Sequence, residues 1–216
     1  MATLIGWIVR AIVFGSIVMY GAMGEILTEK AGHLNLGTPG IMCIGGAFGF
    51  AGAYAYENAV ADPNFLVCIL VGVGAAFVSG ALAGLIYCFL TATLLVNQNV
   101  VGLTLTIFGV GVGKFFGTYV IPEGAVTTKA LFSNKVFIAK IPVLSNLGVV
   151  GELLFSYGFM VYLAIVVAVL VHLFLNKSRV GLNLRAVGEN PATADAAGIN
   201  VTKYKYLAIM VGSGIT

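Results

Sequence analysis

The sequence predicts an all-α, polytopic bundle of transmembrane helices. Hydrophobic residues make up 60% of the 216-residue chain and charged residues only 9%, whereas soluble domains carry roughly 25% charge. The apolar runs are continuous and close to the ~20 residues that cross a bilayer as a helix. Strands of a membrane barrel would instead alternate apolar and polar residues. The lipid bilayer is therefore the expected surrounding of this chain.

Six apolar segments are expected to enter the membrane, all within one domain, 1–216. The first five are long enough to cross it, and Arg10 interrupts the first. The sixth is only ~16 Å long as a helix, about half a bilayer. We therefore expect an incomplete last span, as in a fragment or an interrupted reading frame. The segments are residues 4–23, 39–56, 65–93, 100–120, 153–175 and 206–216.

Glycine is about twice as frequent as usual, with 29 residues. Small residues three or four positions apart let helices approach closely in lipid. We predict tight helix packing at these glycines, and a sharper alternative is sliding contacts that let helices rock. They are Gly45, Gly49 and Gly52, then Gly80 and Gly84, then Gly109, Gly113 and Gly117.

A polar island, residues 176–205, separates the last two apolar segments. It holds five of the eleven cationic residues, and basic loops between spans stay on the cytoplasmic side. Alternation then places residues 25–37 and 97–99 inside, and residues 57–63 and 122–152 outside. The net charge of +3 therefore indicates orientation, and no nucleic-acid binding is expected.

The island contains one short helix whose two ends are specified by sequence. Asn190 is a good N-cap, Pro191 suits the first helical position, and residues 192–197 favour helix. Gly198 can then adopt the left-handed conformation that ends a helix. A capped helix in a basic cytoplasmic loop indicates a segment that contacts a soluble partner. The alternative is a loop that is only solvated.

Polar residues near the fourth apolar segment allow two interpretations. Asn97, Gln98 and Asn99 could face a translocation path or cap a cytoplasmic turn, and the turn is favoured because the topology demands one. Thr104 and Thr106 could line the path, although threonines in spans usually bond their own backbone.

No group of residues indicates covalent chemistry. The three cysteines lie in apolar runs without metal-type spacing, and both histidines lack carboxylate or cysteine neighbours in sequence. We expect no catalytic residues, no bound metal and no cofactor.

Three segments together resemble a known family. Residues 24–50 (GEILTEKAGHLNLGTPGIMCIGGAFGF), 97–113 (NQNVVGLTLTIFGVGVG) and 181–208 (GLNLRAVGENPATADAAGINVTKYKYLA) are similar to permease subunits of ATP-binding-cassette (ABC) importers. The nearest branch is the nucleoside and simple-sugar permeases, related to the branched-chain amino-acid permeases. The resemblance extends from about residue 21 to the C-terminus.

The resemblance implies a non-enzymatic permease of the prokaryotic cell membrane. It would assemble with a second, homologous or identical permease subunit, with cytoplasmic ABC ATPase subunits and with an extracytoplasmic substrate-binding lipoprotein. ATP-driven alternating access would move a nucleoside or similar small polar solute. The coupling segment that docks on the ATPase would comprise Gly188, Glu189, Asn190, Pro191, Ala192, Asp195, Ala196, Ala197 and Gly198.

Two other functions remain open. An ion-coupled carrier or channel would require carboxylates buried within spans, and Glu25, Glu57 and Glu152 lie at span ends. A truncated subunit would function only beside a longer permease. The solute is also open, since pentoses, riboflavin-like compounds and branched amino acids are alternatives to nucleosides.

Overall fold

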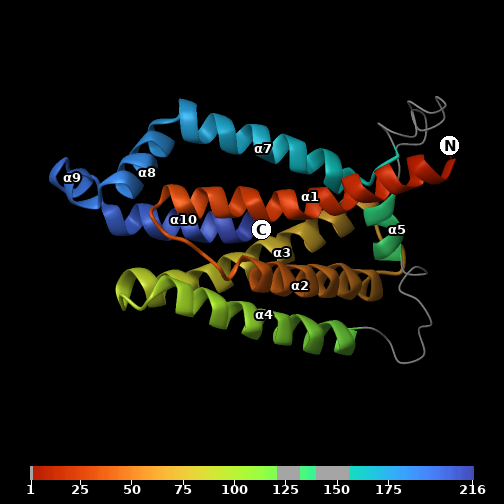
Figure 1. Ribbon diagram of the computed structural model, residues 1–216. Coiled ribbons are helices and arrows are strands. Elements are labelled where there is room, and N and C mark those ends of the chain that lie inside the picture. Colours follow the sequence, from red (N-terminus) through yellow and green to blue (C-terminus); the bar gives the residue numbers. More distant parts are fainter. Residues whose placement is uncertain (1, 121–131, 140–155) are drawn as a thin grey trace.

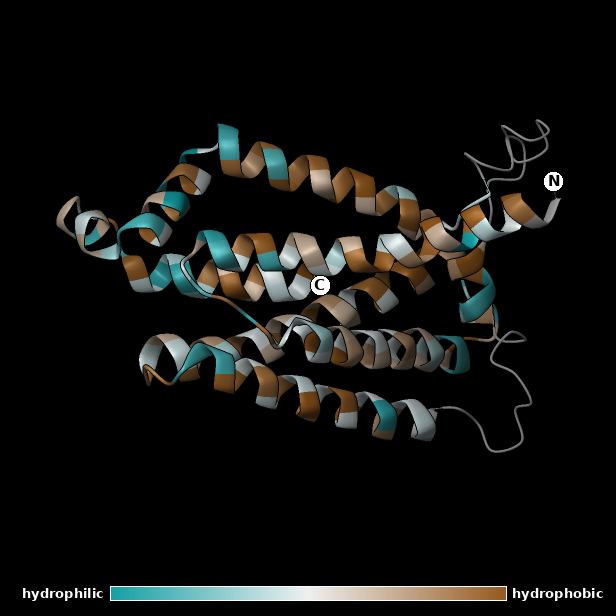
Figure 2. Ribbon diagram, viewed as in Figure 1, coloured by the Kyte–Doolittle hydropathy of each residue, from teal (hydrophilic) through white to brown (hydrophobic). Residues whose placement is uncertain are grey.

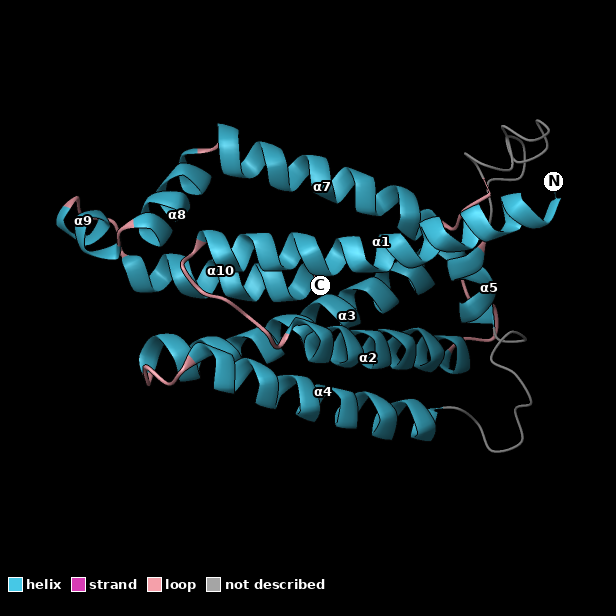
Figure 3. Ribbon diagram, viewed as in Figure 1, coloured by secondary structure: helices cyan, strands magenta, loops and turns pink. Residues whose placement is uncertain are grey.

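The computed structural model describes residues 2–120, 132–139 and 156–216. Helices make up nearly all of this part, and no strand occurs within it (Figure 3). By length and composition, four of its helices can cross a membrane: Leu4–Lys30, Phe65–Thr93, Gln98–Thr118 and Phe159–Lys177. The predicted all-α polytopic bundle is confirmed.

The first helix, α1 (Ala2–Lys30), continues beyond the predicted segment 4–23. The sequence suggests a polar patch from Glu25 onward, yet the helix runs through it to Lys30. It can do so because the Glu25 carboxylate accepts hydrogen bonds from the Asn35 amide (2.7 Å) and the Thr38 hydroxyl (2.9 Å). A partly buried carboxylate is tolerated when it has such donors.

Three helices form one packed group: α2 (Thr38–Ala59), α3 (Phe65–Cys88) and α4 (Gln98–Val120), with α2 in the middle. A π-helical turn, η1 (Phe89–Thr93), extends α3 to the predicted end at residue 93. The helix predicted at 39–56 is present as α2, which is not one of the four helices long and apolar enough to cross a membrane.

Glycines hold these helices together, as predicted. A Cβ on Gly109 of α4 would lie 2.6 Å from the Gly40 Cα of α2, and a Cβ on Gly49 would lie 2.9 Å from the Ala76 Cβ of α3. These spacings leave no room for a methyl group. The predicted close approach also holds at Gly52, Gly80, Gly84 and Gly113, is looser at Gly45, and is absent at Gly117, where a Cβ would meet nothing within 4 Å.

A short helix absent from the sequence prediction, α5 (Phe132–Ile138), lies where α2 ends. The Glu57 carboxylate of α2 accepts hydrogen bonds from the backbone amides of Phe132 (2.8 Å) and Ser133 (3.0 Å). A carboxylate at a helix N-terminus satisfies free amides and complements the helix dipole. Most of the predicted polar stretch 122–152 lies outside the described residues.

The helix predicted at 153–175 begins later, as α7 (Phe159–Lys177). Residues 153–155 lie outside the described part, and residues 156–158 are not helical. Gly158 has an extended backbone at the N-cap position (φ −66°, ψ 158°), so the helix starts at the next residue.

The island 176–205 is more helical than predicted. It contains α8 (Arg179–Glu189), α9 (Pro191–Ala196) and the start of α10 (Val201–Ile215). Only α9 was predicted. Helix α10 begins five residues before the apolar segment 206–216, because the Asn200 side chain accepts a hydrogen bond from the Lys203 amide (2.9 Å) and caps it.

The long helices pack as a series of neighbours in the order α4, α2, α3, α10, α1 and α7. In Figure 1 the connection from α1 to α2, the turn before α4, and helices α8 and α9 share one end of the bundle. Helix α5 lies at the opposite end. Figure 2 shows hydrophobic residues along α7 and α4 and hydrophilic residues gathered in α8, α9 and the start of α10.

Candidate functional site

Helix α9 is the most exposed helix of the island end of the bundle (Figure 1). The Asn190 side chain accepts a hydrogen bond from the Thr193 amide (3.1 Å), and Pro191 occupies the first helical position. Both features of the predicted N-terminus are therefore present. The cap satisfies one of the amides that the first turn of a helix leaves free.

The other end of α9 is closed by a Schellman motif. Gly198 has φ +80°, its amide donates to the Asp195 carbonyl (2.8 Å), and the Ile199 amide donates to the Ala194 carbonyl (3.0 Å). This pair of bonds requires a left-handed residue, which glycine adopts without a steric penalty. The predicted role of Gly198 as the helix stop is confirmed.

The predicted coupling residues are nearly all exposed. Of the nine residues, only Gly188 is half-buried. The other eight are exposed: Glu189, Asn190, Pro191, Ala192, Asp195, Ala196, Ala197 and Gly198. The sequence did not single out Ala194, which is 4% exposed and faces inward. Helix α9 packs against α8 and α10, so it is a fixed projection on the bundle.

Helix α8 connects α9 to the membrane helices. Its Leu184 belongs to a buried apolar cluster with Leu27 and Ala31 of the α1 end and with Leu175 of α7. Its N-terminus is capped by Ser178, whose hydroxyl accepts a hydrogen bond from the Gly181 amide (2.9 Å). Helix α8 was not predicted from the sequence, although a serine directly before a helical segment is a typical N-cap signal.

Gly181 also allows α7 and α8 to meet at a close turn. A Cβ there would collide with the Phe174 carbonyl oxygen and lie 2.8 Å from the Leu175 Cα. The glycine therefore sets the direction in which α8 leaves α7.

The residues considered for a solute path mostly bond to backbone. Asn97 accepts a hydrogen bond from the Asn99 amide (3.0 Å) and caps α4, and Thr104 donates to the Val100 carbonyl of its own helix (2.8 Å). Gln98 and Thr106 instead bond to the backbone of residues 34 and 36. These contacts agree with the turn interpretation, and a path role for the five residues stays a prediction.

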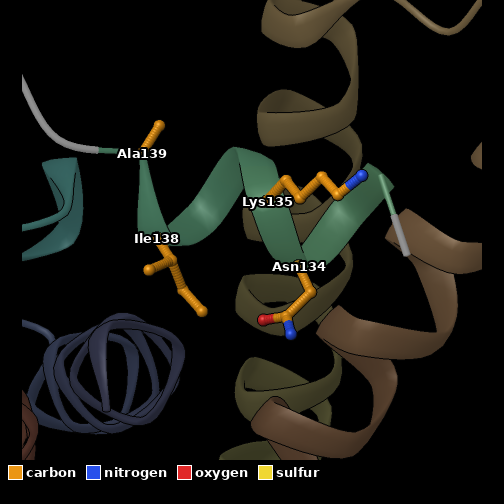
Figure 4. Close-up of a pocket in the computed structure, with 4 residues that line it drawn as sticks. All are labelled: Asn134, Lys135, Ile138 and Ala139. Carbon is orange, nitrogen blue, oxygen red and sulfur yellow. The ribbon is translucent and has the colours of Figure 1, made fainter. Parts of the chain in front are cut away.

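An apolar pocket of about 1120 Å³, partly open to the outside, lies between α1, α2, α3, α7 and α10, and residues of α5 and α8 also line it. Its lining includes Tyr20, Phe77, Val171 and Ala208, and none of the five path candidates lines it. A smaller cavity of about 390 Å³ lies against α5, lined by Asn134, Lys135, Ile138 and Ala139 (Figure 4).

The loop between α1 and α2 contains a buried histidine. His33 is 2% exposed, and neither ring nitrogen has a hydrogen-bond partner among the described residues. Burial, with a smaller contribution from the positive charge of Lys205, lowers the pKa of His33 to about 4. The described residues contain no group of three His, Cys, Asp or Glu side chains that could hold a metal ion.

Sequence comparisons relate the chain to transport proteins. The profile of the family described as branched-chain amino acid transport system / permease component matches residues 7–216. The chain is 33% identical over 199 residues to a Haloferax volcanii protein provisionally named glucose ABC transporter permease protein TsgC13, covering 92% of this chain and 56% of that protein.

Two bacterial relatives are named for nucleosides. The nucleoside ABC transporter permease protein NupC of Lactococcus lactis is 28% identical over 209 residues, which cover 96% of this chain and 63% of NupC. The guanosine ABC transporter permease protein NupQ of Bacillus subtilis is 30% identical over 203 residues, 93% of this chain and 61% of NupQ. The chain thus spans about three fifths of the length of these relatives. No solved structure matches it.

Proposed function

We propose a function for this chain from one premise: it belongs to the family of permease components of branched-chain amino acid transport systems, and it is a multi-pass protein of the prokaryotic plasma membrane. We infer that it is a permease subunit of an ATP-driven importer, with α9 as the helix that docks on a cytoplasmic ATPase subunit. The chain itself then performs no catalysis.

The observation that carries this proposal is the construction of α9. The helix is fixed at both ends, by the Asn190 cap and by Gly198, and presents an exposed surface of small side chains. A rigid projection of this kind fits into a groove and moves as a body with its partner. Motion of the partner can then be converted into rearrangement of the bundle, as alternating access requires.

The proposed solute is a nucleoside or a sugar. Relatives named for a nucleoside, for guanosine and for glucose support this class. Nucleosides and sugars are polar but uncharged, so their recognition needs hydrogen-bonding side chains and no buried counter-ion. A second permease subunit and an extracytoplasmic binding protein are the further partners that the proposal includes.

Glu25 bears on the ion-coupled alternative. It is the acidic residue closest to the middle of a membrane-crossing helix in the described part, and both of its carboxylate oxygens accept hydrogen bonds from residues 35 and 38. Its geometry is that of a structural anchor for the loop after α1, so it does not favour a proton or sodium site.

The proposal is tested by placing a bulky charge on the exposed surface of α9. Uptake is measured in vesicles that contain the chain with its second permease subunit, its binding protein and its ATPase subunits. Ala196→Arg is expected to abolish ATP-driven uptake of whichever of guanosine and glucose the wild type takes up. Ala186→Arg, on the exposed side of α8, is the matched control and should retain uptake. Equal uptake by both variants, at equal amounts of folded protein, would contradict docking at α9.

A further inference from the structure

A short loop, residues 31–37, links the island to the far side of the bundle. We propose that this loop transmits displacement of α8 to α4. The loop contacts α8 at Gly32, and side chains of α4 are hydrogen-bonded to its backbone. The inference extends the proposed function, since it concerns the route by which motion at α9 would reach the membrane helices.

The loop meets α8 through two glycine backbones. A Cβ on Gly32 would lie 3.3 Å from the Gly188 Cα, and a Cβ on Gly188 would collide with the Lys30 carbonyl oxygen and lie 3.1 Å from the Gly32 amide nitrogen. Gly32 has φ +80°, so glycine is also favoured there by backbone conformation. With no flexible side chain between them, a shift of α8 displaces the loop directly.

On its other side the loop is bonded to α4. The Gln98 side-chain oxygen accepts a hydrogen bond from the Leu34 amide (2.9 Å), and the Thr106 hydroxyl donates to the Leu36 carbonyl (2.7 Å). These two residues of α4 lie eight positions apart, so they hold both ends of the segment 34–36. The Tyr87 hydroxyl of α3 holds the same segment by donating to the Leu34 carbonyl (2.7 Å).

No direct helix contact provides this connection. In the described part of the chain the backbone of α4 comes close only to α2, α3 and η1, and not to α8, α9 or α10. Val101 and Leu105 of α4 share a buried apolar cluster with Ile209 of α10, but no residue of α8 or α9 belongs to that cluster. Competing routes pass from α8 to α10 and then through η1 or α3 to α4. The loop route is shorter, because Gly32 contacts α8 and Leu34, two residues later, is bonded to α4.

A double-mutant cycle on the purified chain tests the loop without any partner. Gly188→Ala disturbs the contact with α8, and Thr106→Val removes the bond to Leu36 with little change in shape. We expect the Tm shift of the double variant to differ from the sum of the single shifts by about 2 °C or more. The control cycle pairs Gly188→Ala with Gly111→Ala, a position in α4 where a Cβ meets nothing within 4 Å, and should be additive.

Additive shifts in both cycles would overturn the inference. If Gly188→Ala does not fold, Leu184→Val replaces it, because this milder change loosens the same face of α8 against Ala31. Hydrogen exchange gives an independent readout: Gly188→Ala should reduce amide protection in residues 98–106, and unchanged protection there would also contradict the loop route.

The transporter gives the second arm of the test. In vesicles that contain the chain with its second permease subunit, binding protein and ATPase subunits, Gly32→Ala alters the loop side of the same contact and leaves residues 188–198 unchanged. ATP hydrolysis should therefore continue while guanosine or glucose uptake per ATP falls several-fold. Full uptake per ATP would count against the loop. If the wild-type chain, assembled with all of these partners, shows no ATP-driven uptake of either probe, the proposed function fails, whereas the stability cycles still decide the inference about the loop.

Discussion

At the scale of single residues, Asn190 determines where α8 ends and α9 begins. Asn190 is the C-cap of α8 and the N-cap of α9, and its extended backbone (φ −150°, ψ 94°) turns the chain between the two helices. Its own amide donates to the Ala186 carbonyl (3.0 Å) while its side chain accepts from Thr193. One residue thus fixes the angle at which α9 leaves the bundle.

Removal of this cap should loosen α9 without unfolding the protein. We expect Asn190→Ala to cost about 1 kcal/mol of local stability, which corresponds to about fivefold faster amide exchange in residues 193–197. Asn190→Ser retains a side-chain acceptor and should exchange nearly as slowly as the wild type. Equal exchange in the alanine and serine variants would show that the cap does not hold α9.

His33 makes stability depend on pH in a defined direction. Its pKa is lowered to about 4 by burial and by Lys205, whereas in the unfolded chain it is near 6.5. The unfolded state therefore binds the proton more readily, and stability falls as pH decreases from about 6.5 towards 4.

The test compares the Tm of wild type and His33→Leu between pH 7 and pH 4.5. Carboxylates titrate in both proteins, so the difference between the two curves isolates His33. We expect the wild type to lose more stability than the variant as pH falls, and parallel curves would contradict a buried, neutral imidazole.

At the scale of helices, two glycines of α4 have opposite roles. Gly109 contacts the backbone of Gly40 in α2, whereas a Cβ at Gly111, on the same helix, would meet nothing within 4 Å. Gly109→Ala should therefore lower the Tm by several degrees through overpacking. Gly111→Ala should leave it unchanged or raise it slightly, because alanine favours helix more than glycine does. Similar Tm losses in both variants would rule out a specific close approach of α2 and α4.

The sequence predicted those helices whose signals are local. Asn190, Pro191 and Gly198 define α9 through neighbouring backbone groups, and the uncharged run 65–93 defines α3 with η1. The extension of α1 could not be predicted, since the donors that hydrogen-bond the Glu25 carboxylate come from residues ten and thirteen positions further along the chain. Helix α8 was missed because its buried side is completed by residues of α1, α7 and α10.

At the scale of the whole molecule, the polar connections separate into two groups. Residues 31–37, the turn before α4 and the island lie together at one end. The Gln98 side chain accepts a hydrogen bond from the Leu34 amide, and a hydrogen bond between the Thr93 and Tyr206 hydroxyls joins the end of η1 to the residue that follows the island. The connection that follows α2 lies with α5 at the other end, where the Glu57 carboxylate accepts hydrogen bonds from the first backbone amides of α5. This separation matches the alternation expected from sequence for residues 25–37, 97–99, 57–63 and the island.

The orientation can be measured with single cysteines at exposed positions of the two ends. In right-side-out vesicles, a membrane-impermeant maleimide should label Asn58→Cys readily and Thr193→Cys only after the membrane is permeabilised, because the basic island is expected inside. Both positions are exposed, so accessibility of the side chain does not differ between them. A Cys43→Ser background removes the exposed native thiol. Labelling of Thr193→Cys in intact vesicles would place α9 outside and make contact with a cytoplasmic ATPase impossible.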